Sequence, residues 1–153
     1  MIDTDKGFTL TREFDATPEQ IWAAWTEPAQ AAEWWHPAGL HTPAESVSID
    51  AKAGGRYAYT MVNDISEEEF PTGGVYREVE APEKLVFTWG APDDDPDDAL
   101  LVTVTIKDLG ELTRMTFDLR GYEGMSGDDD IYDGWESALD ALAQHLGQSA
   151  VAG

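Results

Sequence analysis

Cysteine is absent from the 153-residue chain, and lysine and arginine together number only nine. The lack of cysteine excludes a disulfide scaffold, a thiol nucleophile, a cysteine-ligated zinc or iron–sulfur site and a redox dithiol. No apolar run approaches the roughly twenty residues of a membrane-spanning helix. The N-terminal residues have neither the basic start nor the apolar run of a signal peptide. We therefore expect a cytoplasmic protein.

The scarce basic residues face 31 aspartates and glutamates, so the formal net charge is −22 at pH 7. A field of this sign repels phosphate backbones and anionic lipid headgroups, which argues against nucleic-acid and membrane-surface partners. Self-repulsion destabilises the compact state unless dissolved ions screen it. The charge predicts adaptation to a salt-rich cytoplasm, although a generally acid-rich proteome would give the same bias.

Hydrophobic residues are nevertheless abundant, at 42% of the chain, and include six tryptophans, five tyrosines and five phenylalanines. A chain of this size and composition folds around a real core and buries roughly two-thirds of its surface. We expect a single domain over residues 1–147 and a frayed tail over residues 148–153.

Hydrophobic periodicity predicts the order of the elements. Residues 7–14 alternate as in a strand. Thr17, Pro18 and Gln20 then form a helix start, Pro28 ends that helix, and a second short helix runs to about residue 35. A series of strands follows, at residues 46–51, 56–62, 74–80, 84–89, 100–107 and 112–120.

The last segment returns to a helical period, and two glycine pairs interrupt the strand region. Apolar residues recur at steps of three and four from Ile131 to Leu146, which predicts a long amphipathic helix. Gly54–Gly55 and Gly73–Gly74 are interpreted as turns. The acidic runs at residues 64–70 and 93–98 are interpreted as solvated hairpin tips, since neither has the spacing of a calcium loop.

Together these elements predict an α+β fold. A curved antiparallel sheet of about six or seven strands carries two short helices and a long C-terminal helix packed across it. Such an arrangement leaves room for a cavity between the sheet and the last helix.

Six segments, covering nearly the whole chain, match a known superfamily in order and spacing. They are FDATPEQIWAAWTEP (14–28), EWWHP (33–37), GGRY (54–57), GVYREVEAPEKLVFTW (74–89), LVTVTIKDLGELTRMTF (101–117) and the GW of DGWESALDALAQHL (133–146). The chain resembles the SRPBCC superfamily, also called START-like or helix-grip, in the branch of activators of the heat-shock-protein-90 ATPase. The resemblance implies the helix-grip fold. Domains of this fold include lipid carriers, polyketide cyclases and co-chaperones, so the fold alone selects no function.

Aromatic residues of the facing elements are the main candidates for a ligand site, with an ordinary filled core as the alternative. In proteins that this chain resembles, the segment around EWWHP and the start of the last helix form the mouth of the pocket. Trp35 and Trp135 are therefore the leading candidates. The full set of candidate ligand-binding residues is Trp25, Trp34, Trp35, His36, Arg56, Tyr57, Tyr59, Phe87, Trp89, Phe117 and Trp135.

The polar candidates are few. His36 and His41 flank a proline- and glycine-containing segment that fixes no ligand geometry, so we expect no metal site. Arg56 follows a glycine pair and could turn inward to meet a ligand carboxylate, with an exposed side chain as the alternative. Motifs for nucleophilic, phosphate, dinucleotide or zinc chemistry are absent, and we assign no catalytic residue and no cofactor.

The leading hypothesis is a protein that binds a small apolar or amphipathic molecule in this cavity. One alternative is a cyclase- or hydrolase-like enzyme that uses His36, His41, Arg56, Tyr57 and Tyr59. Another is an interaction module for a chaperone or for self-association, which would expose an apolar patch of several hundred Å².

Overall fold

The protein is described by a computed structural model that covers residues 7–36, 39–90, 99–121 and 130–146. The predicted tail (148–153) and the acidic run at 93–98 lie outside these residues. The elements in chain order are β1 (Gly7–Phe14), α1 (Pro18–Thr26), α2 (Pro28–Ala31), β2 (Leu40–His41), the 3-10 turn η1 (Ala44–Ser46), β3 (Ser48–Ile49), β4 (Arg56–Asn63), β5 (Glu69–Glu80), β6 (Lys84–Trp89), β7 (Leu100–Asp108), β8 (Thr113–Arg120) and α3 (Asp130–His145).

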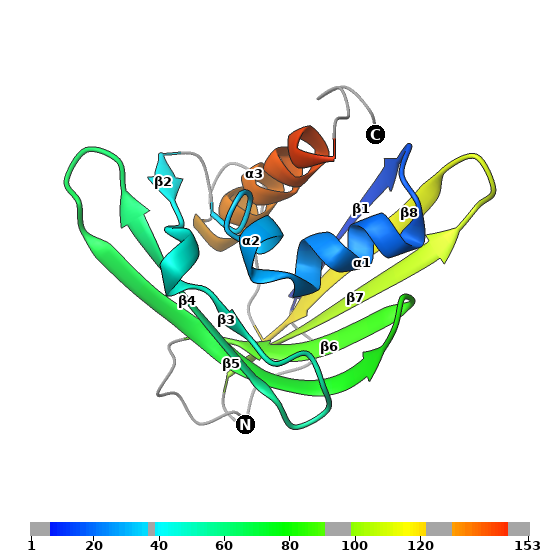
Figure 1. Ribbon diagram of the computed structural model, residues 1–153, viewed down its shortest axis with the longest axis horizontal. Coiled ribbons are helices and arrows are strands. Elements are labelled where there is room, and N and C mark those ends of the chain that lie inside the picture. The colour runs from blue at the N-terminus through cyan, green and yellow to red at the C-terminus, as the bar shows by residue number, and fades with distance from the viewer. Residues whose placement is uncertain (1–6, 37–38, 91–98, 122–129, 147–153) are drawn as a thin grey trace.

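The strands form one antiparallel sheet in the order β1-β8-β7-β6-β5-β4-β2, with β3 also paired to β4. Successive strands from β4 to β8 are neighbours and form a meander, and the first strand adds beside the last. The sheet curves, and the helices lie on its concave side (Figure 1). The predicted α+β helix-grip fold is confirmed, with β2 and β3 as two-residue strands beside six longer ones.

Helix α1 begins with the capping box that the sequence predicts. The Thr17 side chain accepts from the Gln20 backbone N–H at 3.1 Å, and the Gln20 side chain accepts from the Thr17 N–H at 2.8 Å. This reciprocal pair satisfies two of the donors that a helix start leaves free. The next helix, α2, ends at Ala31 instead of continuing to residue 35. Beyond Ala31 the regular four-residue spacing of α-helical hydrogen bonds is lost, since some bonds join residues only three apart, such as that from the Trp34 N–H to the Ala31 carbonyl.

Gly73 and Gly74 do not form the predicted turn. Both lie inside β5, which begins at Glu69 and not at residue 74, and they pair with Ala58 and Tyr57 of β4. A Cβ on Gly74 would lie 1.9 Å from the Thr88 carbonyl oxygen. Glycine is therefore required by the close approach of β5 and β6.

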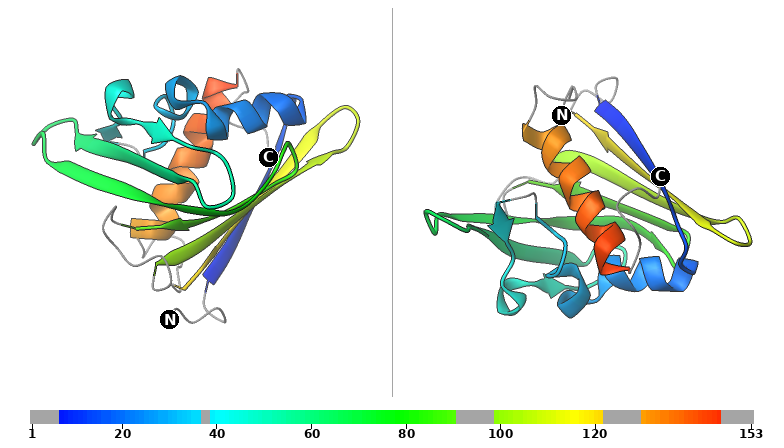
Figure 2. Two further views of the ribbon diagram at one scale, coloured as in Figure 1. Left: turned by 60° about the horizontal axis from the view of Figure 1, so that its bottom comes forward. Right: turned by 90° about the horizontal axis from the view of Figure 1, so that it is seen from above.

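Helix α3 crosses the concave face diagonally (Figure 2). Its inward stripe holds Trp135, Ala138, Leu139, Leu142 and Ala143, all buried. This spacing of three and four is the periodicity that the sequence predicts, and it packs one helix face on the sheet. No helix among the described residues is long and apolar enough to cross a membrane.

Candidate functional site

Seven aromatic side chains meet between the sheet and the helices, and we call them the aromatic pocket. They come from α1, the segment after α2, β4, β6 and α3, and are Trp25, Trp35, Tyr57, Tyr59, Phe87, Trp89 and Trp135. Six are buried, while Trp89 is only partly buried. The structure thus brings together seven of the eleven residues that the sequence proposes for a ligand site.

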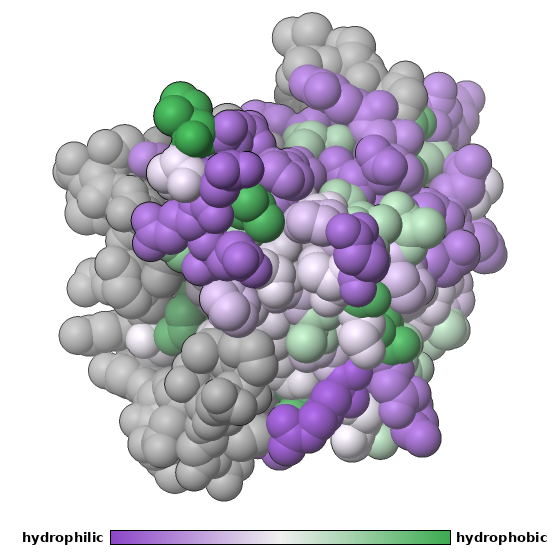
Figure 3. Space-filling model, turned by 60° about the vertical axis from the view of Figure 1, so that its left-hand side comes forward, coloured by the Kyte–Doolittle hydropathy of each residue, from purple (hydrophilic) through white to green (hydrophobic). Residues whose placement is uncertain are grey.

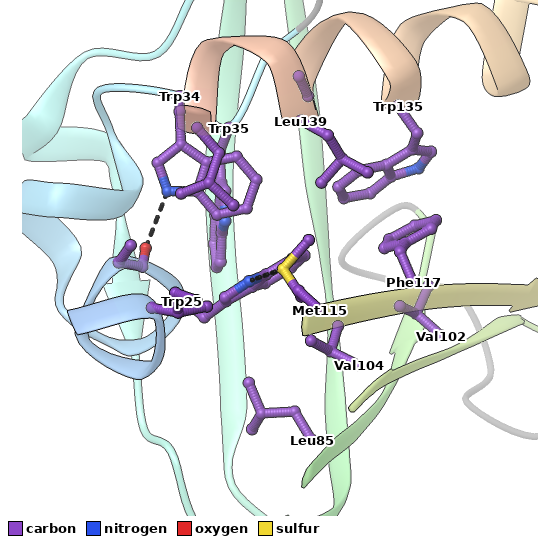
Figure 4. Packing of buried hydrophobic residues seen from close by; sticks show 14 of the residues in the cluster. Trp25, Trp34, Trp35, Leu85, Val102, Val104, Met115, Phe117, Trp135 and Leu139 are labelled. Atoms are coloured by element: carbon purple, nitrogen blue, oxygen red, sulfur yellow. Dashed lines mark hydrogen bonds between the residues drawn. The ribbon is translucent and has the colours of Figure 1, made fainter. Parts of the chain in front are cut away.

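Trp25 is the centre of the surrounding cluster (Figure 4). Its ring centroid lies 4.6 Å from that of Trp34 in an edge-to-face contact and 6.3 Å from that of Trp135 in a stacked one. Its indole N–H donates to the Met115 sulfur at 3.2 Å. Because each aromatic pair contributes about 0.5–1.5 kcal/mol beyond area burial, Trp25 fixes α1 firmly on the sheet.

Trp34 and Phe117 support the aromatic pocket without lining it. The Trp34 indole N–H donates to the Ala24 carbonyl at 2.9 Å, which turns this fully buried ring toward α1. Phe117 lies on β8 with its centroid 4.5 Å from that of Trp135. Both are predicted ligand contacts; in the structure both lie in the packing layer around the pocket, and their contact with a ligand stays a prediction.

The space inside the aromatic pocket is small. It totals about 150 Å³, and no part of it is wide enough for a water molecule. Ligand pockets commonly measure about 300–1,000 Å³. The protein's own side chains fill this place, so these residues do not form the ligand-sized cavity that the sequence predicts.

The side chains described as lining the aromatic pocket carry two oxygen atoms, and both are tyrosine hydroxyls. The Tyr57 hydroxyl donates to the Thr88 carbonyl at 2.6 Å, and the Tyr59 hydroxyl accepts from the Trp89 indole N–H at 3.0 Å. Burial raises the pKa of both tyrosines well above the ordinary value. Both are therefore neutral donors and acceptors at physiological pH and poor bases.

Two indole N–H groups of the aromatic pocket make no hydrogen bond within the described ranges of the chain. The Nε1 atoms of Trp35 and Trp135 are buried and find no partner among the described residues. An unsatisfied buried donor costs about 1–3 kcal/mol, and native proteins contain few of them. Two in one pocket mark the places where hydrogen-bond acceptors are missing.

His36 does not line the aromatic pocket. Its Nδ1 lies 3.2 Å from the Thr42 hydroxyl oxygen, and that hydroxyl donates its single proton to the Trp35 carbonyl at 2.8 Å. His36 must therefore be the donor to Thr42, which places a proton on Nδ1. Burial lowers the pKa of His36. The negative charge of Asp64 acts to raise this pKa but offsets only part of the effect of burial. The imidazole thus stabilises the backbone beside Trp35 and does not point a base at the pocket.

Arg56 is exposed, so the proposal that it turns inward to meet a ligand is wrong. It is the first residue of β4, and its successors Tyr57 and Tyr59 point into the aromatic pocket. Side chains alternate along a strand, so the register that buries Tyr57 points Arg56 to the opposite face.

The remaining histidine of the enzyme alternative is also outside the aromatic pocket. His41 Nδ1 lies 2.6 Å from an Asp64 carboxylate oxygen, and both side chains are about half exposed. The described residues contain no group of three or more histidines and acids arranged to hold a metal ion. Of the five polar residues proposed for catalysis, the pocket therefore receives only Tyr57 and Tyr59.

Two residues near the site escaped the sequence reasoning. Thr88 is buried at 2% exposure, its hydroxyl accepts from the Val75 N–H at 2.9 Å, and its carbonyl holds Tyr57. Met115, on β8, accepts the hydrogen bond of the Trp25 indole, a pairing that no pattern in the sequence predicts. The signal for Thr88 is a polar residue between Phe87 and Trp89, in a strand that is otherwise apolar after Lys84.

Large exposed hydrophobic side chains occur at two hairpin ends. Ile65 is 95% exposed and Phe70 37% at the β4–β5 end, and Leu109 and Leu112 are about as exposed as Phe70 at the β7–β8 end. In the face drawn in Figure 3, hydrophobic residues of the described part are scattered among hydrophilic ones and form no broad area.

Similar structures share this architecture. The AHSA1 protein from Silicibacter pomeroyi is 31% identical over 92% of this chain and 97% of its own, with a TM-score of 0.73. A protein from Chromobacterium violaceum matches at 24% identity over 94% of this chain and 99% of its own, with a TM-score of 0.80. A protein from Arthrobacter aurescens matches at 24% identity over 98% and 91%, with a TM-score of 0.78. A comparison with curated proteins finds no match.

The family profile described as activator of Hsp90 ATPase homolog 1-like protein matches residues 15–147. This range includes α1, the meander and α3, together with every residue of the aromatic pocket. The chain therefore belongs to the activator of Hsp90 ATPase homolog 1-like family, with its START-like helix-grip fold.

Proposed function

We propose that the protein binds a small, largely apolar molecule in the aromatic pocket, which opens by outward rotation of the Trp89 side chain. The observation that carries the proposal is the pair of buried indole N–H groups of Trp35 and Trp135, which have no hydrogen-bond partner in the part of the chain that the structure describes. A pocket built only as core would satisfy such donors. A bound molecule that accepts a hydrogen bond from one of these N–H groups removes part of the free-energy cost of leaving them unpaired in the closed pocket.

Trp89 is the side chain whose displacement costs least. It is the one partly buried member of the aromatic pocket, and its indole makes one hydrogen bond, to Tyr59. Its ring centroid lies 5.4 Å from that of Trp135. Tyr57, by contrast, is 4% exposed, donates to a backbone carbonyl and packs against four other aromatic rings. Rotation of Trp89 would vacate the volume of one indole next to Trp135 and Tyr59.

The two alternative functions have less support. A cyclase- or hydrolase-like reaction needs an acid or base in the pocket, and the tyrosines there have raised pKa values while His36 and His41 lie elsewhere. A chaperone-binding module needs a continuous apolar surface, whereas the large exposed apolar side chains of the described residues are confined to two at each of two hairpin ends.

The test is a titration of ¹⁵N-labelled protein with naphthalene, followed through the indole N–H resonances. We expect saturable shifts at Trp35 and Trp135 and none at Trp22, which packs at the edge of the core outside the pocket. Trp35→Phe and Trp135→Phe assign the two resonances, and Trp22→Phe is the matched control. The proposal fails if naphthalene produces no saturable shift, or if the shifts lie only at tryptophans outside the pocket.

A further inference from the structure

The unpaired groups of the aromatic pocket specify the chemistry of its occupant. We propose that the occupant is an uncharged molecule carrying a hydrogen-bond acceptor, such as a ketone or ester carbonyl, directed at the indole N–H of Trp35 or Trp135. This inference rests on the binding function proposed above.

Donors exceed acceptors in this pocket. The indole N–H of Trp35 and that of Trp135 can only donate, and both are free of described partners. The Tyr59 hydroxyl accepts from Trp89, and its own proton is donated to no described residue. The Tyr57 hydroxyl proton is already used by the Thr88 carbonyl. A molecule that fits this set must therefore bring acceptors.

A carboxylate would be the strongest acceptor, but no residue described as lining the pocket can neutralise its charge. None of the seven lining residues is charged. The burial of this environment disfavours a negative oxygen, and it raises the pKa of Tyr57 and of Tyr59 for that reason. The net charge of −22 adds long-range repulsion. A neutral acceptor meets the donors without either cost.

Three probes of nearly equal shape separate these effects. They are 2-acetylnaphthalene, which has a neutral carbonyl, 2-isopropenylnaphthalene, which replaces the carbonyl oxygen by a CH₂ group, and 2-naphthoate, which replaces the methyl ketone by a carboxylate. Dissociation constants are measured by calorimetry and by the indole resonances at neutral pH. We expect the ketone to bind about tenfold more tightly than the alkene, because a hydrogen bond to a stranded donor contributes about that factor. We expect no measurable binding of the carboxylate.

Repeating the series in molar KCl separates the local cost from the long-range repulsion. The screening length falls to about 3 Å at that ionic strength, so the repulsion from surface carboxylates is removed. If the uncharged lining is responsible, 2-naphthoate still binds far more weakly than the ketone. If its affinity then equals that of the ketone, the exclusion of anions is refuted.

Substitutions locate the acceptor. Trp35→Phe and Trp135→Phe keep an aromatic ring and remove only the donor and part of the indole. At least one of them should reduce the ketone-to-alkene ratio to near one, while Trp22→Phe leaves it unchanged. A ratio that survives both pocket variants overturns the inference, as does equal binding of ketone and alkene by the unmodified protein. If no neutral probe binds, the proposed binding function fails as well, which distinguishes the two failures.

Discussion

Replacing Trp89 with alanine should strengthen the binding of a neutral probe. This is an unusual expectation for a large aromatic side chain in a binding pocket, where truncation ordinarily weakens binding. It follows from the closed state, in which the Trp89 indole occupies the space that the probe needs. When only a small fraction of the molecules is in the open, binding-competent state, the apparent affinity is lower than that of the open state by this fraction. A substitution that favours the open state removes the reduction.

The size of the effect follows from the contacts of Trp89. Opening breaks its hydrogen bond to Tyr59, worth about 0.5–1.5 kcal/mol, and its edge-to-face contact with Trp135, worth about 0.5–1.5 kcal/mol. The sum of about 1–3 kcal/mol corresponds to a gain of about 5- to 150-fold in affinity. Tyr59→Phe keeps the ring and removes only the hydrogen bond, so it should give about 2- to 12-fold.

Calorimetric titration with 2-acetylnaphthalene measures both variants against the unmodified protein. Urea unfolding is recorded in parallel, because the affinity comparison holds only where every variant is fully folded. The order of affinities should be Trp89→Ala, then Tyr59→Phe, then the unmodified protein. Unchanged binding by folded Trp89→Ala would show that Trp89 does not close the pocket, and weaker binding would show that it is a ligand contact.

Three further changes test the fold itself. Gly74→Ala should destabilise the protein by at least about 3 kcal/mol in urea unfolding, because the new Cβ would meet the Thr88 carbonyl at 1.9 Å; a smaller loss would mean that β5 and β6 separate easily. Thr113→Val should cost about 1–2 kcal/mol, because the buried hydroxyl donates to the Ala16 carbonyl at 2.6 Å and no similar donor replaces it; a neutral result would indicate that water reaches that carbonyl. The melting temperature should rise between low and molar KCl, because screening relieves the repulsion of 22 excess negative charges; an unchanged value would refute adaptation to a salt-rich cytoplasm.

Most of the fold could be predicted from the sequence, because local patterns determine most of it. Alternation identifies the long strands, and the capping residues Thr17 and Gln20 identify the start of α1. The prediction of a turn at Gly73–Gly74 is wrong because these glycines are required by the close packing of β5 against its neighbouring strands and not by a local bend. Only the approach of β6, with the Thr88 carbonyl against Gly74, shows that a side chain is forbidden there.

The sequence predicts which residues meet at the candidate site, but not whether they enclose an open space or fill it themselves. Aromatic residues of facing elements were expected to meet, and seven of them do. Whether such a cluster encloses a ligand-sized space depends on side-chain rotamers and on the separation of α3 from the sheet, and no sequence pattern encodes either. The error at Arg56 has a different cause. The glycine pair before it does not determine to which face of β4 the Arg56 side chain points.

The distribution of charge separates the stability of this protein from its proposed binding. The excess negative charge of 22 belongs to the chain as a whole, while the aromatic pocket is lined by uncharged residues only. Salt should therefore act on folding, through repulsion between surface carboxylates, and not on the selection of a neutral ligand. The ratio of ketone to alkene affinity is the clean measure, because the effect of salt on the solubility of the two probes largely cancels in it. That ratio should stay constant from low to molar KCl as long as the protein is folded, and a ratio that varies with salt would mean that charged groups act on the bound molecule.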